Sequence, residues 1–157
     1  MTAKARPRLF TEAPLSANET VDLGKDKAHF LKNVLRLSPG DHVAFFNGKD
    51  GEWLGRIDSL SKSTATVVLV NCTRPQTPMP DVWLVFAPIK RARIDFVAEK
   101  VTELGVAQIR PVITRRTVMS RVNTGRLEAN ALEASEQCER LDVPTVFEPQ
   151  SLATLLD

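Results

Sequence analysis

The chain has 157 residues, of which 43% are hydrophobic and 25% are charged, as in ordinary soluble globular proteins. It contains no run of about 18 apolar residues, which excludes a predicted transmembrane helix. The N-terminus MTAKARPRLF is basic, but no apolar segment follows it. We therefore predict no secretory signal and expect a cytoplasmic protein. Cys72 and Cys138 lie far apart, and the two histidines show no metal-ligand spacing, so no metal site is predicted.

The net charge of +2 is unevenly distributed along the chain. Residues 88–121 carry eight Lys or Arg and three Asp or Glu, whereas residues 122–157 carry two and seven. A basic block in a nearly neutral chain is typical of a protein that binds a polyanion. Charge that serves only solubility is the alternative interpretation.

Residues 1–72 are predicted to form a small β-barrel. Asp26 can cap a helix that runs to about Leu37 and ends at SPGD. We expect an apolar stripe of this helix to face the core and a polar stripe to face the solvent: Phe30, Leu31, Val34 and Leu35 inside, and His29, Lys32, Asn33 and Arg36 outside. DHVAFFNGKDGEWLGRIDSL predicts two strands around an NGKDG turn, and STATVVLVNCT predicts a further strand.

Residues 73–80, TRPQTPMP, contain three prolines and predict a semi-rigid linker. Strand and helix patterns then alternate through residues 81–157. DVWLVFAP is typical of a strand buried on both faces. Helix, strand, helix and strand follow, ending with PTVFEP, and QSLATLLD begins another helix. This β-α-β-α-β order predicts a parallel sheet with right-handed crossovers.

The two longer helices of this second part are expected to bury apolar stripes at helical spacing. The stripes are Ile94, Val97, Ala98, Val101 and Leu104, with Gly105 as the residue that ends the helix, and Leu127, Ala131, Ala134, Cys138 and Leu141. Cys138 is therefore predicted to be a core thiol.

Basic side chains follow two neighbouring strands of the predicted sheet. Lys90, Arg91 and Arg93 come after the first strand, and Arg115 and Arg116 come after the second. Ligands of parallel α/β sheets bind at the carboxyl ends of the strands, so we expect both clusters to project from one edge. Arginines in such an array suit phosphate groups. Solvated loop charge is the alternative interpretation.

Other motifs of catalysis are missing from the sequence. It has no GxGxxG or Walker A loop, and its histidines have no partner Ser or Cys motif, so no dinucleotide site, P-loop or hydrolytic triad is predicted. Lys100 with Glu103, and Glu136 with Arg140, have the helical spacing of surface ion pairs.

Four segments of the chain resemble a known family: RLF, HFLKNVLRLSPGD, KRARIDFVAEKVTELGVAQIRPVITRRT and EASEQCERLDVP. They occur in the order seen in the bacterial small-subunit ribosomal RNA uracil-N3 methyltransferases, which belong to the SPOUT class of trefoil-knotted enzymes. The resemblance implies an N-terminal PUA-like barrel that holds RNA and a C-terminal α/β SPOUT domain that uses S-adenosylmethionine. The implied reaction is methylation of N3 of one uridine in the 16S ribosomal RNA of the assembled small subunit.

The sequence departs from this family at its C-terminal end. Family members continue through a Gly-rich GPEGG-like loop and an LG…R.LR.ETA-like segment, which tie the knot and form the methyl-donor site, and neither occurs here. We therefore expect an N-terminal fragment with the first half of the SPOUT domain. Cofactor-binding residues are expected beyond residue 157. Such a fragment would transfer no methyl group, and its part of the family's homodimer interface would be incomplete.

The resemblance implies two sets of site residues. The residues implied to bind RNA are Arg6, Arg8, His29, Arg36, Lys90, Arg91, Arg93, Arg115 and Arg116. The residues implied to be catalytic are Arg116, expected nearest the uracil, and Glu136, Gln137 and Arg140, which match the family's EQ-x-x-R segment. Two other functions are open: a non-catalytic RNA-binding module, and a protein-interaction domain that uses the acidic tail.

Overall fold

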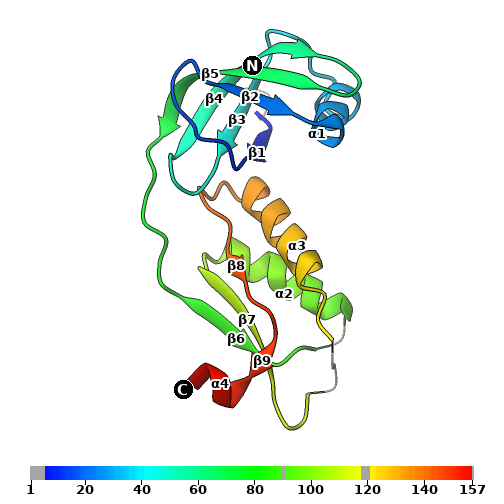
Figure 1. Ribbon diagram of the computed structural model, residues 1–157, viewed down its shortest axis with the longest axis vertical. Coiled ribbons are helices and arrows are strands. Elements are labelled where there is room, and N and C mark those ends of the chain that lie inside the picture. The colour runs from blue at the N-terminus through cyan, green and yellow to red at the C-terminus, as the bar shows by residue number, and fades with distance from the viewer. Residues whose placement is uncertain (1–5, 90, 118–120, 157) are drawn as a thin grey trace. The chain divides into compact units, whose positions relative to one another are not determined.

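The computed structural model describes residues 6–89, 91–117 and 121–156 (Figure 1). Contacts within the chain divide it into two compact units, residues 1–77 and 78–157. Each unit has its own hydrophobic core.

The first unit is built on a five-stranded sheet. Its strands are β1 (Arg8–Phe10), β2 (Thr20–Leu23), β3 (His42–Phe46), β4 (Glu52–Leu60) and β5 (Ala65–Arg74), in the order β1-β3-β4-β5-β2. The predicted strands β3, β4 and β5 are confirmed and pair antiparallel. Strands β1 and β2 were not predicted, because they are short and pair with β3 and β5, which are remote in the sequence. Register shifts between β4 and β5 mark irregularities that bend a sheet.

The helix of the first unit buries a different stripe from the predicted one. Helix α1 (Lys25–His29) continues as a π-helical turn, η1 (Phe30–Val34), in which the N–H of Leu35 donates to the carbonyl of Phe30. Ala28 and Leu31 are fully buried, but Phe30 is 39% and Val34 59% exposed. The prediction was wrong for these two residues because Ala28 sets the inner face, and Leu31 and Leu35 follow it at i+3 and i+7.

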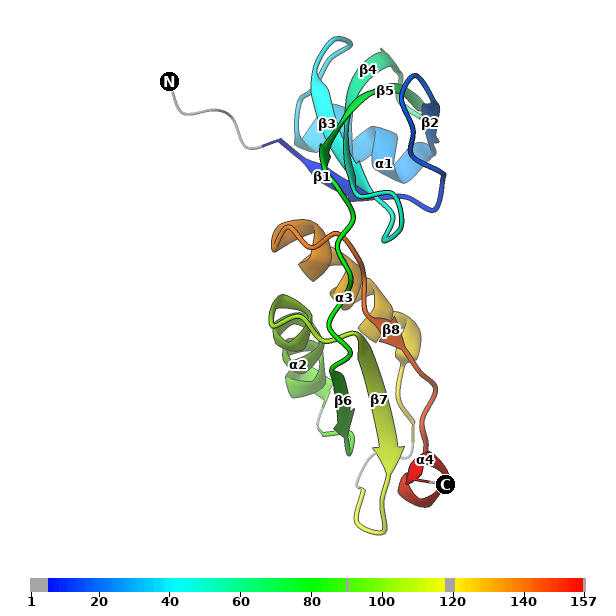
Figure 2. The ribbon, with the colours of Figure 1, turned by 90° about the vertical axis from the view of Figure 1, so that its left-hand side faces the viewer.

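The second unit contains a parallel sheet, as predicted. Its strands are β6 (Trp83–Phe86), β7 (Gln108–Ile113) and β8 (Thr145–Val146), and a short strand, β9 (Gln150–Ser151), pairs with the end of β7. The helices are α2 (Arg91–Glu103), α3 (Thr124–Gln137) and α4 (Leu152–Leu156). Both crossovers step in one direction across the sheet, so α2 and α3 pack on the same face (Figure 2).

In the described part of the chain, α2 and α3 do not cover the other face of this sheet, where Arg110 lies over the rings of Trp83 and Phe147. Leu84 and Phe86 pack into the core, but Trp83 and Val85 point to the opposite face and are 46% and 40% exposed. The prediction that this strand is buried on both faces was therefore wrong, because the two longer helices cover one face only.

The predicted helix stripes are confirmed except at their C-terminal ends. Gly105, with a φ of 93°, ends α2, and the N–H of Val106 donates back to the carbonyl of Val101, as in a Schellman motif. Leu104 lies past the last helical residue and is 84% exposed, not buried. Cys138 caps the C-terminus of α3 and is only half-buried, so the predicted core position was wrong in part.

Candidate functional site

The carboxyl edge of the parallel sheet brings together the basic residues that follow β6 and β7. The two strands run parallel with Phe86 opposite Pro111, so the segments that leave them start from one edge. Arg93 is exposed in the first turns of α2, and Arg115 and Arg116 are exposed in the turn after β7. Lys90 lies outside the described residues, and the side chain of Arg91 is likewise not described.

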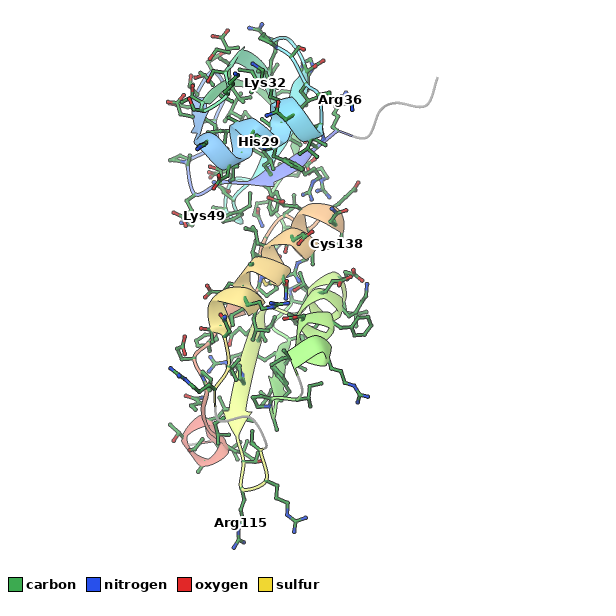
Figure 3. The ribbon with its side chains drawn as sticks, turned by 90° about the vertical axis from the view of Figure 1, so that its right-hand side faces the viewer. His29, Lys32, Arg36, Lys49, Arg115 and Cys138 are labelled. Carbon is green, nitrogen blue, oxygen red and sulfur yellow. The ribbon has the colours of Figure 1, made fainter. Side chains whose placement is uncertain are left out.

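Local hydrogen bonds hold the turn that carries Arg115 and Arg116. The N–H of Thr117 donates to the carbonyl of Thr114 at 3.1 Å, and the N–H of Thr114 donates to Oγ1 of Thr117 at 2.8 Å. The two arginines occupy the central positions of this closed turn, and Figure 3 shows Arg115 pointing away from the sheet. A turn held by its own threonines presents both guanidinium groups to solvent, where an anion can reach them.

A hollow of about 480 Å³ lies at the same end of the unit, beside the beginnings of α2 and α3. Its lining includes Arg121, Asn123 and the ion pair between Asp95 and Arg126. The side chain of Asn123 caps α3 by accepting from the N–H of Arg126 at 3.0 Å. Backbone N–H groups at the start of a helix and a nearby exposed arginine favour negative charge in such a hollow.

Sequence reasoning missed the ion pair that joins the two helices at this hollow. Nε and Nη2 of Arg126 donate to the two carboxylate oxygens of Asp95 at 2.9 and 2.6 Å, and Nδ2 of Asn130 donates to the same carboxylate at 3.1 Å. Hydrogen bonding to Asp95 raises the pKa of Arg126. Because Asp95 and Arg126 lie far apart in sequence on different helices, no local spacing signals their contact.

Arg140, implied to be catalytic, lies at the opposite edge of the sheet from Arg115 and Arg116. Its guanidinium donates to the carbonyls of Thr102 at 2.7 Å and Val106 at 3.0 Å, and to Asp142 at 2.6 Å. These bonds join the C-terminal end of α2 to the segment after α3. The side chain of Arg140 is only 10% exposed, so the described contacts give it a structural role.

Glu136 and Gln137 lie in the last turn of α3, also far from the carboxyl edge of the sheet. Gln137 lines a second hollow between α2 and α3 whose other lining residues include Glu99, Glu103 and Glu133. The structure therefore does not bring Arg116 together with the EQ-x-x-R segment within this chain, because α2 and α3 both run from the carboxyl edge of the sheet to its amino edge. Catalytic roles for the four residues stay predictions.

The predicted RNA-binding residues of the first unit differ in their accessibility. Arg6, His29 and Arg36 are exposed. Arg8 is not: its Nε donates to Glu52 at 2.6 Å, its guanidinium lies 4.6 Å from the centre of the Phe46 ring, and its side chain is 9% exposed. Its contacts within the unit occupy the group that would bind a phosphate.

The described residues contain neither a membrane-spanning helix nor a cluster of metal ligands. No helix among them is long and apolar enough to cross a membrane. Over the same part of the chain, no three His, Cys, Asp or Glu side chains gather as a metal site would require.

Together, the fold and the basic residues at the carboxyl edge of the parallel sheet define a protein in which a small β-rich unit is followed along the chain by an α/β unit with an anion-attracting edge. Residues 75–157 match the sequence model of a family described as RNA methyltransferase domain, and residues 23–70 match one described as RNA methyltransferase PUA domain. The chain belongs to the RNA methyltransferase domain family. The resemblance found in the sequence is thereby confirmed, as is the mixed α/β fold with a PUA-like domain.

Several characterised relatives carry the same name. The chain is 34% identical to ribosomal RNA small subunit methyltransferase E of Rickettsia conorii over 88% of its own length and 57% of the relative's. It is 30% identical to the protein of that name from Synechocystis, over 88% of this chain and 46% of the relative's length. The chain thus spans about half the length of these relatives.

Solved structures give the same result for the fold. Ribosomal RNA small subunit methyltransferase E from Neisseria gonorrhoeae, solved bound to S-adenosyl methionine, superimposes with a TM-score of 0.87 at 29% identity. The match covers 98% of this chain and 65% of that one. A putative methyltransferase from Legionella pneumophila, at 23% identity and a TM-score of 0.81, shares the fold.

Proposed function

We propose that the chain is the RNA-holding part, with the first half of the catalytic domain, of an S-adenosylmethionine-dependent methyltransferase. Its substrate would be N3 of a uridine in the 16S ribosomal RNA of the small subunit. The observation that carries the proposal is the rim: Arg93, Arg115 and Arg116 leave one edge of a parallel sheet in a domain of the RNA methyltransferase family. The names of the relatives supply the class of RNA.

The chemistry of the reaction explains why arginines would lie there. A uridine must turn out of its stack before N3 can reach a pocket. N3 carries an imide proton, and methyl transfer to it requires that the proton be removed or that the uracil anion be stabilised. A guanidinium such as that of Arg116 can stabilise this anion, and its neighbour Arg115 can hold the adjacent phosphate.

The described residues do not fit a complete site for S-adenosylmethionine. The hollow at the carboxyl edge is lined by Asp95, Arg121 and Arg126, and two of these are already paired with each other. Gly105 and Gly125 are the only glycines of residues 78–157, so the sequence offers no Gly-rich loop for close approach to a cofactor.

We infer that residues outside these 157 complete the cofactor pocket, the trefoil knot and the homodimer interface. The chain's coverage of about half of its relatives supports this, as does the face of the sheet at Trp83 and Val85, which α2 and α3 do not cover. On the same reading, residues 1–72 are the PUA-like domain, 73–80 the linker and 81–157 the partial methyltransferase domain. Calorimetric titration of the 157-residue chain with S-adenosylmethionine should detect only weak binding, and tight one-to-one binding would refute the inference.

The RNA-binding part of the proposal is tested by the salt dependence of affinity. Binding of a 16S ribosomal RNA fragment should weaken linearly with the logarithm of salt concentration, and Arg115→Ala with Arg116→Ala should reduce the slope by about 2. A matched control is Arg56→Ala with Lys62→Ala, which removes two exposed cations of the first unit. Equal effects of the two double variants would contradict a specific role for the rim.

A further inference from the structure

We propose that the outer face of the α1–η1 helix holds an unpaired stretch of RNA, with one base stacked on the ring of Phe30. We take this outer face to comprise His29, Phe30, the half-buried Lys32, Asn33 and Val34 of the helix, together with Arg36, which follows the helix end with a φ of 55°. The inference rests on the proposed function, which makes RNA the ligand. The inference goes further than that function because it specifies the surface of the first unit that binds the RNA and the contacts that this surface makes.

The first observation is that the helix exposes its larger apolar side chains. Phe30 and Val34, at i and i+4, form an apolar pair on the surface, while Leu31 and Leu35 pack against the sheet. The pair lies in the π-helical turn, and such turns are frequent at functional sites. The exposed ring of Phe30 offers a flat apolar surface on which a ligand can stack.

The second observation is the uncompensated positive charge on the same helix and just past its end. Lys32 lies in η1 and Arg36 lies two residues past its end, and Figure 3 labels both together with His29. In the described part of the chain, neither cation is within ion-pair distance of a carboxylate. Two other cations of this unit are engaged within it, since Lys27 donates to the carbonyl of Phe10 and Arg74 donates to Glu52.

An aromatic ring among free cations is the arrangement that binds single-stranded nucleic acid. The ring stacks on a base of any kind, and the cations contact the phosphates on either side of it. A base inside an RNA duplex cannot reach such a ring, because it remains stacked on its neighbours. The geometry therefore predicts a preference for unpaired over paired RNA that depends on Phe30 and not on the cations.

The test compares binding of a mixed-sequence 12-nucleotide single-stranded RNA and of its duplex by the full 157-residue chain. Phe30→Ala should weaken single-strand binding about 5- to 150-fold, the range for one base on one ring, and leave its salt slope and duplex binding unchanged. Phe30→Leu keeps an apolar side chain but removes the ring, and should weaken binding in the same way. Lys32→Ala should instead lower the salt slope by about 0.7.

The matched control is Phe96→Ala, which removes a 60% exposed phenylalanine from α2 of the second unit. Circular dichroism should show that every variant is folded. Single-strand affinity that is the same for Phe30→Ala, Phe30→Leu and Phe96→Ala would overturn the inference and favour a protein partner for this face. A chain that binds neither RNA form would overturn the proposed function as well, so the two failures can be told apart.

Discussion

Arg126 on α3 and Asp95 on α2 form a two-pronged ion pair, with Nε and Nη2 donating to the two carboxylate oxygens at 2.9 and 2.6 Å. Asn130, one turn further along α3, donates to the same carboxylate. The pair lies at the beginnings of both helices, beside the hollow that Arg121 also lines. The ion pair therefore joins α2, which follows β6, to α3, which follows β7.

Replacing either partner of this pair should loosen the second unit. Arg126→Lys keeps the charge but loses the forked geometry, and Asp95→Asn loses the charge of the acceptor. We expect each change to lower the urea midpoint, followed by the fluorescence of Trp83 in a Trp53→Phe background. The variant with both changes should be at least as stable as the less stable of the two single variants, because the second change removes no further interaction. Fully additive losses would show that the two side chains are not coupled.

Arg140 should prove to be a structural residue of the second unit. Arg140→Ala removes the partners of the Thr102 and Val106 carbonyls and leaves the carboxylate of Asp142 unpaired. We expect a loss of about 2–4 kcal/mol in the free energy of unfolding, because both arginine and carboxylate are largely buried. Urea unfolding followed by the fluorescence of Trp83 measures this loss.

Measurement of RNA affinity distinguishes a structural role of Arg140 from a role in RNA binding. At a temperature where the Arg140→Ala variant is folded, its affinity for a 16S ribosomal RNA fragment should equal that of the parent chain. A stable variant that loses RNA affinity would reverse our assignment and restore Arg140 to the site.

Glu52 should make the first unit sensitive to acid. Burial alone would raise the pKa of this carboxyl, but hydrogen bonds from Arg74, Arg8 and Thr73 outweigh burial and lower the pKa below its usual 4.5. A lowered pKa in the folded state means that ionised Glu52 stabilises the unit above the unfolded pKa. This stabilisation is lost as the pH falls through the lower, folded value.

We expect Glu52→Gln to cost about 1–3 kcal/mol at pH 7 and to flatten the stability profile at and below pH 4.5. Urea unfolding followed by Trp53, in a Trp83→Phe background, measures this unit alone. Asp58→Asn, an exposed carboxylate on the same strand, is the control and should change stability little. An unchanged acid profile in Glu52→Gln would assign the acid sensitivity to other groups.

Gly55 on β4 should not tolerate a side chain. A Cβ at this position would lie 2.5 Å from Cγ1 of Val67 and 3.2 Å from the ring of Phe45, both fully buried. Gly55→Ala should therefore destabilise the first unit by about 1–3 kcal/mol through overpacking. The same Trp53 measurement applies, and a companion Val67→Ala change should recover part of the loss by making room. If Val67→Ala recovers none of the loss, contact with Val67 is not the cause of the destabilisation.

The sequence predicts most of the second unit because its elements depend on local patterns. The buried positions of each helix, such as Ile94 and Ala98 in α2 or Leu127 in α3, are set by the spacing of apolar residues within that helix. The end of α2 is likewise set locally, by Gly105. The parallel order of the strands then follows from the alternation of strand and helix. This order was enough to predict that Arg115 and the basic start of α2 share one edge.

Predictions failed where a residue's surroundings come from distant parts of the chain. Trp83 and Val85 look like core residues, but which face a helix covers is decided by the direction of the crossovers. Phe30 looks like a core residue until Ala28 is seen to set the inner face of the helix. The ion pair of Arg8 with Glu52 was also not predicted, because it forms only when β1 pairs with β3, and RNA binding by Arg8 stays a prediction.

The sequence by itself determined the family, the order of the elements and the basic edge of the sheet, because these depend on local composition and on chain order. Only the tertiary structure separated the cations that face solvent, such as Arg115 and Arg36, from those held inside the fold, such as Arg8 and Arg140. The distinction depends on contacts with Glu52, Thr102 and Val106, which folding brings near from elsewhere in the chain.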